Sequence, residues 1–151
     1  MALSDDMQLL SGQPLFQGLD VDQLRLIAFG AERKSIGQGQ PLFRQHAPAE
    51  CAYVVARGRF ELIETGHDGK AHVAAVAGQG TMLSELALAT MVERKYTAIA
   101  LEEAEVLRIP RSLFHRLLEE YPSLGQVMQQ RIRDSLLALA KGAKALEDRF
   151  R

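Results

Sequence analysis

The feature that most constrains the fold is a series of short β-type runs, separated by glycine-bearing turns, in the middle of the 151-residue sequence. Seven or eight runs at such close spacing are typical of an antiparallel sandwich or jelly-roll barrel, in which each strand buries one face. The Asp68-Gly69 pair gives a hairpin signal between two of the runs. We expect strands at residues 32–36, 41–44, 51–56, 60–64, 70–76, 94–101 and 105–109.

Segments with helical periodicity flank these strands on both sides. Asp20 suits the N-cap of an early helix that Gly30 ends. Pro110 fits the first turn of a later helix, where its missing N–H costs little. We expect helices at residues 2–10, 21–29, 111–120 and 123–149. The sequence therefore predicts a mainly β fold with flanking helices, built as an antiparallel jelly-roll β-barrel of about eight strands.

The length suits one compact domain and is short for two. We expect a single domain over residues 1–151. Its parts are N-terminal helices in residues 1–30, the barrel in 31–109 and C-terminal helices, the last of them long, in 110–151.

The composition excludes several classes of protein. Apolar residues make up 47%, which favours a packed core over disorder, and a net charge of −1 argues against a dedicated nucleic-acid binder. The single cysteine, Cys51, excludes an internal disulfide and is expected to be a buried thiol. The start lacks the pattern of a signal peptide, and no apolar stretch is long enough to span a bilayer. We expect a cytoplasmic protein that contacts neither membrane nor DNA.

An irregular loop at residues 78–97 interrupts the β pattern. Gly78 and Gly80 open it, a short apolar turn at residues 83–88 follows, and Arg94 comes nine residues after Glu85. Such a loop can present backbone N–H groups and one guanidinium to a small anionic ligand.

The order of these elements and the loop sequence resemble the cyclic nucleotide-binding domain. That family includes the sensory domain of Crp/Fnr regulators, the regulatory subunits of protein kinase A and the cytoplasmic domains of cyclic nucleotide-gated channels. Its phosphate-binding cassette reads approximately F-G-E-[LI]-A-L, then P-R-x-A-T; here LSELAL at 83–88 and ERKYT at 93–97 take those places. Residues 14–19, 41–46 and 53–60 also match, so that the resemblance covers about residues 13–140, with the cassette at 80–97.

The resemblance implies a cyclic nucleotide sensor, for cAMP or cGMP, that signals through movement of its C-terminal helix. Glu85 would accept from the ribose 2′-hydroxyl and Arg94 would pair with the cyclic phosphate. Leu86 and Ala87 would lend backbone donors, and Leu139 would form part of a hydrophobic lid over the base. The ligand-binding residues implied in this way are Leu83, Ser84, Glu85, Leu86, Ala87, Arg94, Lys95, Tyr96 and Leu139.

The cassette also departs from the family pattern. Ser84 replaces its glycine, Glu93 replaces its proline, and Lys95 and Tyr96 replace small residues. His46 stands where the family has a loop glycine. These departures keep a second hypothesis open: a degenerate domain that binds no nucleotide and serves as a protein-interaction or dimerisation module.

The long C-terminal helix carries an apolar seam. From Ile132 onward its spacing is that of a heptad repeat. The seam either packs on the chain's own barrel or forms a homodimer, and an unidentified protein is the other partner that we consider. The seam residues are Leu124, Met128, Ile132, Leu136, Leu139, Ala143, Leu146 and Phe150.

Catalysis and metal binding are not indicated. The four histidines form no H-x-H pair, and no nucleophile–base grouping or carboxylate pair is evident, so we expect no metal, no cofactor and no enzyme activity. No helix-turn-helix pattern follows Phe150, so the chain does not resemble a complete Crp-type transcription factor. We expect a stand-alone sensor or an excised domain; the Met1 start makes excision less expected at that end.

Overall fold

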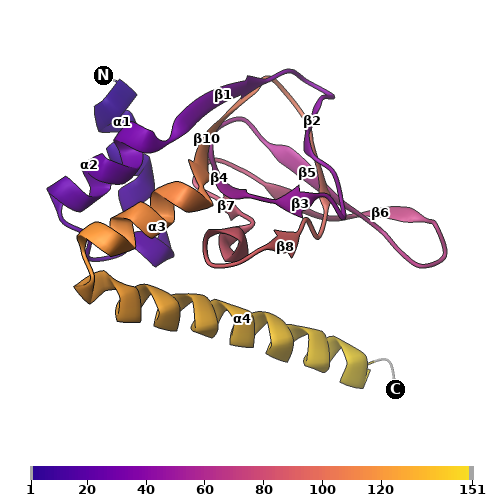
Figure 1. The fold of residues 1–151 in the computed structure, drawn as a ribbon. Coiled ribbons are helices and arrows are strands. Elements are labelled where there is room, and N and C mark those ends of the chain that lie inside the picture. Colours follow the sequence, from indigo (N-terminus) through magenta and orange to yellow (C-terminus); the bar gives the residue numbers. More distant parts are fainter. Residues whose placement is uncertain (1, 150–151) are drawn as a thin grey trace.

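The computed structural model describes the backbone of residues 2–149 and the side chains of residues 3–137 (Figure 1). The helices of this part are α1 (Ala2–Ser11), η1 (Pro14–Phe16), α2 (Val21–Gly30), η2 (Glu85–Leu88), α3 (Arg111–Glu120) and α4 (Ser123–Arg149), η marking 3₁₀ turns. The strands are β1 (Glu32–Ile36), β2 (Pro41–Phe43), β3 (Pro48–Ala49), β4 (Cys51–Arg57), β5 (Phe60–Thr65), β6 (Ala71–Ala77), β7 (Met82–Leu83), β8 (Val92–Glu93), β9 (Thr97–Ala100) and β10 (Ala104–Pro110).

The strands form two four-stranded antiparallel sheets, in the orders β1-β10-β4-β7 and β2-β9-β5-β6, with β3 and β8 as a separate pair. The predicted antiparallel jelly roll with flanking helices is confirmed. Within residues 2–149 there are ten strands rather than about eight, and the fold as a whole is a mixture of helices and sheets. The additional strands β3, β7 and β8 contain two residues each, which is too short for an alternating pattern to show.

The strand predicted at residues 94–101 is wrong at its start, since β9 begins at Thr97. The reason is a competing set of backbone hydrogen bonds. The Arg94 N–H donates to the Ala47 carbonyl and the His46 N–H donates to the Arg94 carbonyl, both at 2.8 Å. The pairing of β3 with β8 therefore continues to Arg94 and separates it from β9.

The helix boundaries follow the predicted signals closely. Asp20 caps α2: its side chain accepts from the Gln23 N–H, and the Gln23 side chain accepts from the Asp20 N–H, which completes a capping box. Pro110 differs slightly from prediction, because it is the last residue of β10 and the N-cap of α3 rather than part of the first turn.

Two hydrophobic clusters make up the core, and β4 separates them. Ala52 and Val54 of this strand face the cluster that the helices form with the barrel, which includes Phe16, Ile27, Phe114 and Met128 among others. Alternate residues of β4 face the barrel interior instead. Those interior residues are Cys51, Tyr53 and Val55, together with Phe60, Leu62, Leu83 and Val106 from other strands. Cys51 is buried, as predicted.

Strand β6 lies at an edge of its sheet, on the side of the barrel away from the N-terminal helices (Figure 1). Residues 71–76 are exposed on both faces and carry no acidic or basic side chain except His72. Ala75 pairs with Leu62, which is buried in the barrel interior, so the two residues share the inner face. Because Ala75 is nevertheless exposed, the inner face of the barrel is open to solvent along β6.

Helix α4 runs beneath the barrel and the cassette (Figure 1). Its first turns carry Met128 and Ile132, which are buried in the chain's own core, whereas Leu136 is 51% exposed. The remaining predicted seam side chains, from Leu139 to Phe150, lie outside the described residues. In the described part of the chain, no helix combines the length and the apolar character needed to cross a bilayer.

Candidate functional site

The predicted cassette forms a turn between β7 and β8. Ser84, in the place of the family's glycine, has φ 63° and ψ 45°, which is the left-handed conformation that glycine adopts most easily. His46, the other residue in the place of an expected glycine, likewise has φ 71°. Both backbones thus keep the geometry that a glycine would have, and two L-residues bear the strain.

The residues that follow Ser84 form the single 3₁₀ turn η2. The Ala87 N–H, a predicted phosphate donor, is bonded to the Ser84 carbonyl at 3.0 Å. The Ala87 carbonyl accepts from Arg111 Nε at 2.6 Å, and the Arg111 guanidinium also donates to the Ala49 carbonyl. Leu86 packs against the helical cluster of the core. The cassette is therefore hydrogen bonded to the first residue of α3.

Glu85 is half-buried at the start of η2 and points toward α4. It lines a cavity of about 270 Å³ together with Gln13, Met82 and Ser135. Burial raises the pKa of the Glu85 carboxyl, and a hydrogen bond with the Ser135 side chain opposes that rise. The candidate ribose acceptor is thus held by a residue of the long helix.

Arg94 is buried in the barrel interior, with a relative exposure of 5%. Its Nη1 donates to the Cys51 carbonyl at 2.9 Å and its Nη2 to the Cys51 Sγ at 3.3 Å. The guanidinium lies over two aromatic rings, 4.6 Å from the centroid of Phe43 and 5.3 Å from that of Tyr53. The hydrogen bonds to Cys51 and the contacts with the two rings therefore fix the orientation of the Arg94 side chain.

Among the residues whose side chains the structure describes, no carboxylate lies within 4.0 Å of the Arg94 guanidinium. Glu93, the neighbouring acid, faces His46 at 3.8 Å instead. Buried charges in proteins are ordinarily paired, since desolvation of an isolated ion costs several kcal/mol. The burial of Arg94 without a carboxylate partner in the described part of the chain is therefore unusual.

Arg94 and Glu85 do not line the same cavity. The cavity beside Arg94 measures about 310 Å³. Its lining consists of Phe43, Arg44, Ala47, Pro48, Glu50, Cys51, Tyr53, Arg94 and Arg108. The two residues to which the resemblance assigned phosphate and ribose thus line different cavities.

The other predicted residues lie around the cassette. Leu83 is buried in the barrel interior and pairs with Tyr53 across β7 and β4. Lys95 is exposed, with its Nζ 5.5 Å from the centroid of the Tyr96 ring, and Tyr96 packs on the barrel interior. The side chain of Leu139 lies outside the described residues.

Sequence reasoning missed the residues that hold the two charged groups. Phe43, Cys51 and Tyr53 surround Arg94, while Ser135 bonds Glu85 and Arg111 fastens the cassette. The alternation of Cys51 and Tyr53 along one strand indicated a shared face, but it did not indicate that Arg94 would lie against it. For Ser135 and Arg111 the sequence offered no signal.

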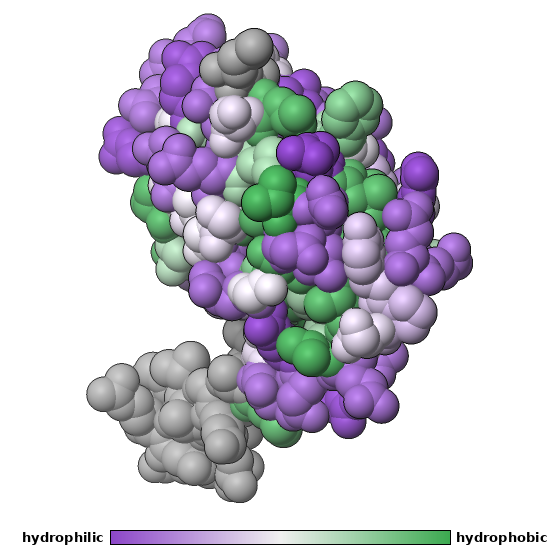
Figure 2. All heavy atoms as spheres, turned by 90° about the vertical axis from the view of Figure 1, so that its left-hand side faces the viewer, coloured by the Kyte–Doolittle hydropathy of each residue, from purple (hydrophilic) through white to green (hydrophobic). Residues whose placement is uncertain are grey.

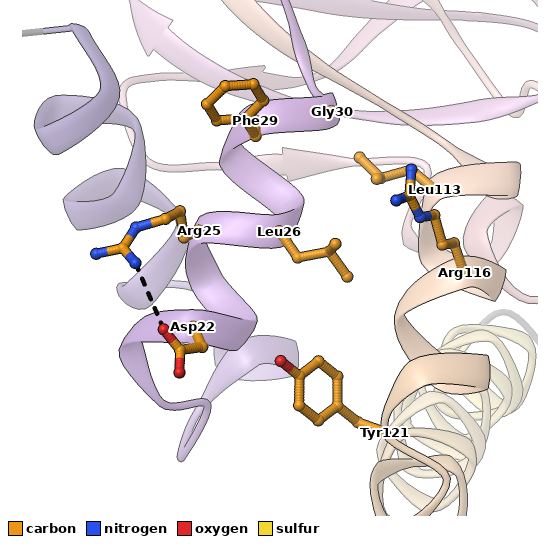
Figure 3. A pocket seen from close by; sticks show the side chains of 8 residues that line it. All are labelled: Asp22, Arg25, Leu26, Phe29, Gly30, Leu113, Arg116 and Tyr121. Carbon is orange, nitrogen blue, oxygen red and sulfur yellow. Dashed lines mark hydrogen bonds and ion pairs between the residues drawn. The ribbon is translucent and has the colours of Figure 1, made fainter.

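A further cavity, of about 460 Å³, lies between α2 and α3 and contains none of the predicted site residues. Figure 3 shows its lining, with Leu26 and Leu113 across from each other and Arg25 bonded to Asp22 away from the opening. It belongs to the helical face of the molecule, on which hydrophobic residues lie scattered among hydrophilic ones (Figure 2). In the described part of the chain, no group of three or more His, Cys, Asp or Glu residues could hold a metal ion.

Comparison with known proteins identifies the domain. Residues 33–121, more than half of the chain, match the family described as "Cyclic nucleotide-binding domain". The chain belongs to this family. This cyclic nucleotide-binding domain is 41% identical to a cyclic nucleotide-binding-like protein from Brucella abortus of known structure. That match has a TM-score of 0.70 and covers 76% of this chain and 98% of that one.

Curated relatives of the cyclic nucleotide-binding domain are longer proteins. The lysophospholipase nte1 of Neurospora crassa is 38% identical over 98 residues, which are 65% of this chain and 6% of the enzyme. The cyclic AMP receptor protein of Thermus thermophilus is 30% identical over 134 residues, which are 86% of this chain and 62% of the receptor. The matched segment is thus a small part of the length of the enzyme.

Proposed function

We propose that this domain is a cyclic nucleotide sensor, for cAMP or cGMP, that acts as a regulatory module through its C-terminal helix. The observation that carries the proposal is the buried Arg94 guanidinium, which has no carboxylate partner among the described side chains. A cyclic phosphate monoanion would supply the missing charge. The Thermus relative, named as a cyclic AMP receptor, supports a ligand of this class.

The proposed binding mode uses the groups around Arg94. The Cys51 carbonyl and the aromatic rings of Phe43 and Tyr53 fix the guanidinium, and a charge-assisted bidentate bond to phosphate is stronger where water is excluded. Glu85 would accept from the ribose, with the backbone of residues 83–87 and the side chains of 95 and 96 at the rim. Leu139 of α4 would lie over the base.

The proposed signal follows from the position of Glu85. Burial raises the pKa of its carboxyl and the Ser135 side chain of α4 opposes that rise, so the two groups interact, and a ribose hydroxyl would compete with Ser135 for the carboxylate. Glu85 and Ser135 also line one cavity, whereas Arg94 lines another. Binding would thus exchange a contact with α4 for one with the ligand, and such a difference between states can drive a switch.

The test is isothermal titration calorimetry with cAMP and cGMP, on the wild-type chain and two variants. We expect Arg94→Gln to weaken binding about 10–100-fold, since a hydrogen bond to a charged group contributes roughly 1.5–3 kcal/mol. The matched control is Arg59→Gln, which removes an exposed arginine paired with Glu102 at 3.6 Å and should leave affinity unchanged. Thermal melts show whether each variant is folded.

Two outcomes would contradict the proposal. Absence of heat and of a thermal shift with either nucleotide at about millimolar ligand, far above an ordinary sensor's Kd, would exclude nucleotide sensing. Equal binding by wild type and Arg94→Gln would exclude the assigned phosphate site.

A second candidate function is the protein-interaction or dimerisation module. The exposed Leu136 and Leu137 on α4 favour it, as does the separation of Glu85 from Arg94. It predicts dimerisation without any nucleotide binding, so that the same calorimetry distinguishes the two functions. A cytoplasmic location stays a prediction under both.

A further inference from the structure

A second arginine, Arg108, faces the cavity beside Arg94. It lies on β10, where it pairs with Tyr53 of β4, and cross-strand partners share a face of the sheet. Arg94 lies over the ring of that same tyrosine, and both arginines line the cavity of about 310 Å³. We propose that this cavity binds a phosphate monoester dianion between the guanidinium groups of Arg94 and Arg108.

The charge of the lining supports a dianion. Three arginines line the cavity, namely Arg44, Arg94 and Arg108, against one carboxylate, that of Glu50. Arg108 also faces Glu32, but the Nη1–Oε2 distance is 3.7 Å and the Glu32 side chain is mostly exposed, so this pair is weak. The cavity therefore has an excess of positive charge beyond what a single monoanion would neutralise.

The donors of the cavity are fixed before any ligand arrives. Cys51 occupies one N–H of each Arg94 terminal nitrogen, which leaves the other N–H groups of the guanidinium for a ligand. The Tyr53 phenol stays protonated at neutral pH, because burial and the Cys51 thiol raise its pKa to about 12 against the opposing effect of Arg94 and Arg108. The side chains of Arg94, Arg108 and Tyr53 thus line one cavity.

The chemistry distinguishes a monoester from a cyclic diester. A monoester dianion has three terminal oxygens and two charges, so it can accept from both guanidinium groups and neutralise both. A cyclic diester has two terminal oxygens and one charge, and it would leave one guanidinium uncompensated. The volume is adequate for a small phosphate compound, being that of roughly ten water molecules.

This inference goes beyond the proposed sensing of cyclic nucleotides. It shares Arg94 and its cavity with the proposed cyclic phosphate site, but it uses neither Glu85 nor α4 and adds Arg108 as a second essential residue. The two proposals can fail separately because one requires a monoester dianion and the other a cyclic diester.

The experiment measures thermal shift and calorimetric affinity with inorganic phosphate at about pH 8, where it is mainly dianionic. Sodium chloride at equal ionic strength and dimethyl phosphate, a diester monoanion, are the comparison solutes. We expect phosphate to raise the Tm, chloride to have no effect, and dimethyl phosphate to bind at least about tenfold more weakly.

Variants locate the site. Arg108→Gln should weaken phosphate binding about 10–100-fold and lower the affinity for cAMP, a monoanion that Arg94 alone can neutralise, by a smaller factor. Arg108→Lys keeps the charge without the planar fork and should give an intermediate loss. Arg59→Gln is again the control for a distant arginine. Because Arg108 is partly exposed and weakly paired, we expect both of its variants to fold.

Each result has a definite meaning. Equal stabilisation by phosphate and dimethyl phosphate, or unchanged phosphate binding by a folded Arg108→Gln variant, would overturn the inference. Phosphate binding that depends on Arg108, in a protein that ignores cAMP and cGMP, would support the inference and exclude the proposed sensor. Nucleotide binding without phosphate binding would do the reverse.

Discussion

At the scale of single residues, Arg94 is held firmly but is not fully compensated. Each cation–π contact contributes about 0.5–2 kcal/mol, and a hydrogen bond from a charged donor about 1.5–3 kcal/mol. The desolvation of a buried ion costs several kcal/mol, and full burial without an anion is rarely tolerated. The contacts with Phe43, Tyr53 and Cys51 therefore offset much of the cost and leave a remainder that an anionic ligand can supply.

Glu85 gives a pH-dependent prediction at the same scale. Burial raises the pKa of its carboxyl in the folded state above the ordinary value of 4.5, so the folded protein binds the proton more tightly than the unfolded chain. The stabilisation from this proton is fully present below the unfolded pKa and is lost as the pH rises through the folded pKa. We therefore expect Glu85→Gln to be more stable than wild type at pH 7.

The measurement is urea denaturation of both proteins across this pH window. The difference in unfolding free energy should shrink as the pH falls below about 4.5, where wild type is protonated too. Glu119→Gln, at an exposed position of α3, serves as the control. A difference that stayed constant with pH would show that the Glu85 carboxyl is not desolvated.

Which residues belong to the candidate site was more predictable than where their side chains lie in the structure. Glu85 and Arg94 stand out in the sequence because they occupy the positions that, by resemblance to the family's cassette, imply contacts with a sugar and a phosphate. Their directions depend on features that no local pattern encodes. Arg94 leaves the path of β9 because its backbone pairs with Ala47, and Glu85 turns toward α4 because Ser135, fifty residues later in the chain, meets it there.

At the scale of elements, the cassette turn is tied to the C-terminal helices as well as to the barrel. The Arg111 guanidinium at the start of α3 donates to the carbonyls of Ala87 in η2 and Ala49 in β3. The Arg111 N–H also donates to the Glu50 carbonyl at 2.9 Å. A displacement of η2 by a ligand would therefore be transmitted directly to the first residue of α3.

The prediction for this link concerns stability. Arg111→Met keeps the length of the side chain but leaves the buried Ala87 carbonyl and the Ala49 carbonyl without their guanidinium donor. We expect a loss of about 1–3 kcal/mol, which for a domain of this size lowers the Tm by about 2–4 °C per kcal/mol.

The matched control is Arg116→Met on the same helix, whose arginine is exposed and paired only with Glu120 at 3.3 Å. Its effect should stay within about 0.5 kcal/mol. Equal stability of the two variants in thermal and urea denaturation would contradict the role of Arg111 as a link.

The elements themselves were largely predictable. Helices can be recognised in a sequence by their capping residues and by a helical period of apolar residues that persists over several turns. Asp20 at the start of α2 and the apolar side of α3 are examples. Strands β5 and β10 alternate long enough to be recognised, and β4 is a continuous apolar run of β-type residues. The two-residue strands exist only because another part of the chain lies opposite them, so local sequence could not reveal them.

At the scale of the whole molecule, the apolar residues of α4 fall into two groups, one buried in the chain's own core and one exposed. Met128 and Ile132 complete the chain's own core, and Leu136 and Leu137 face solvent in the single chain. The first turns of the helix thus pack internally, and the later described turn has exposed apolar side chains without a partner within residues 3–137. A homodimer through the seam stays a prediction.

This division predicts the behaviour of two substitutions. Leu136→Lys should weaken any homodimer without lowering the stability of the single chain, since the residue is half-exposed there. Met128→Ala should destabilise the domain by about 2–5 kcal/mol, because its side chain is fully buried. Sedimentation velocity across concentration, together with thermal melts, checks both expectations.

A wild-type chain that stays strictly monomeric at about 100 µM would count against a seam dimer of any tighter affinity, by mass action. Destabilisation of a monomeric protein by Leu136→Lys would instead place that residue in the core of its own chain.

The position of Tyr53 has an optical consequence. The sequence contains no tryptophan and three tyrosines, so tyrosine emission is not masked by indole. Tyr53 lies beneath the Arg94 guanidinium and stacks on Phe43, with ring centroids 5.9 Å apart. An anion that draws the guanidinium away from this ring changes the electric field at the chromophore. The domain therefore carries its own spectroscopic reporter of Arg94, and occupancy of the site can be followed in the unlabelled protein.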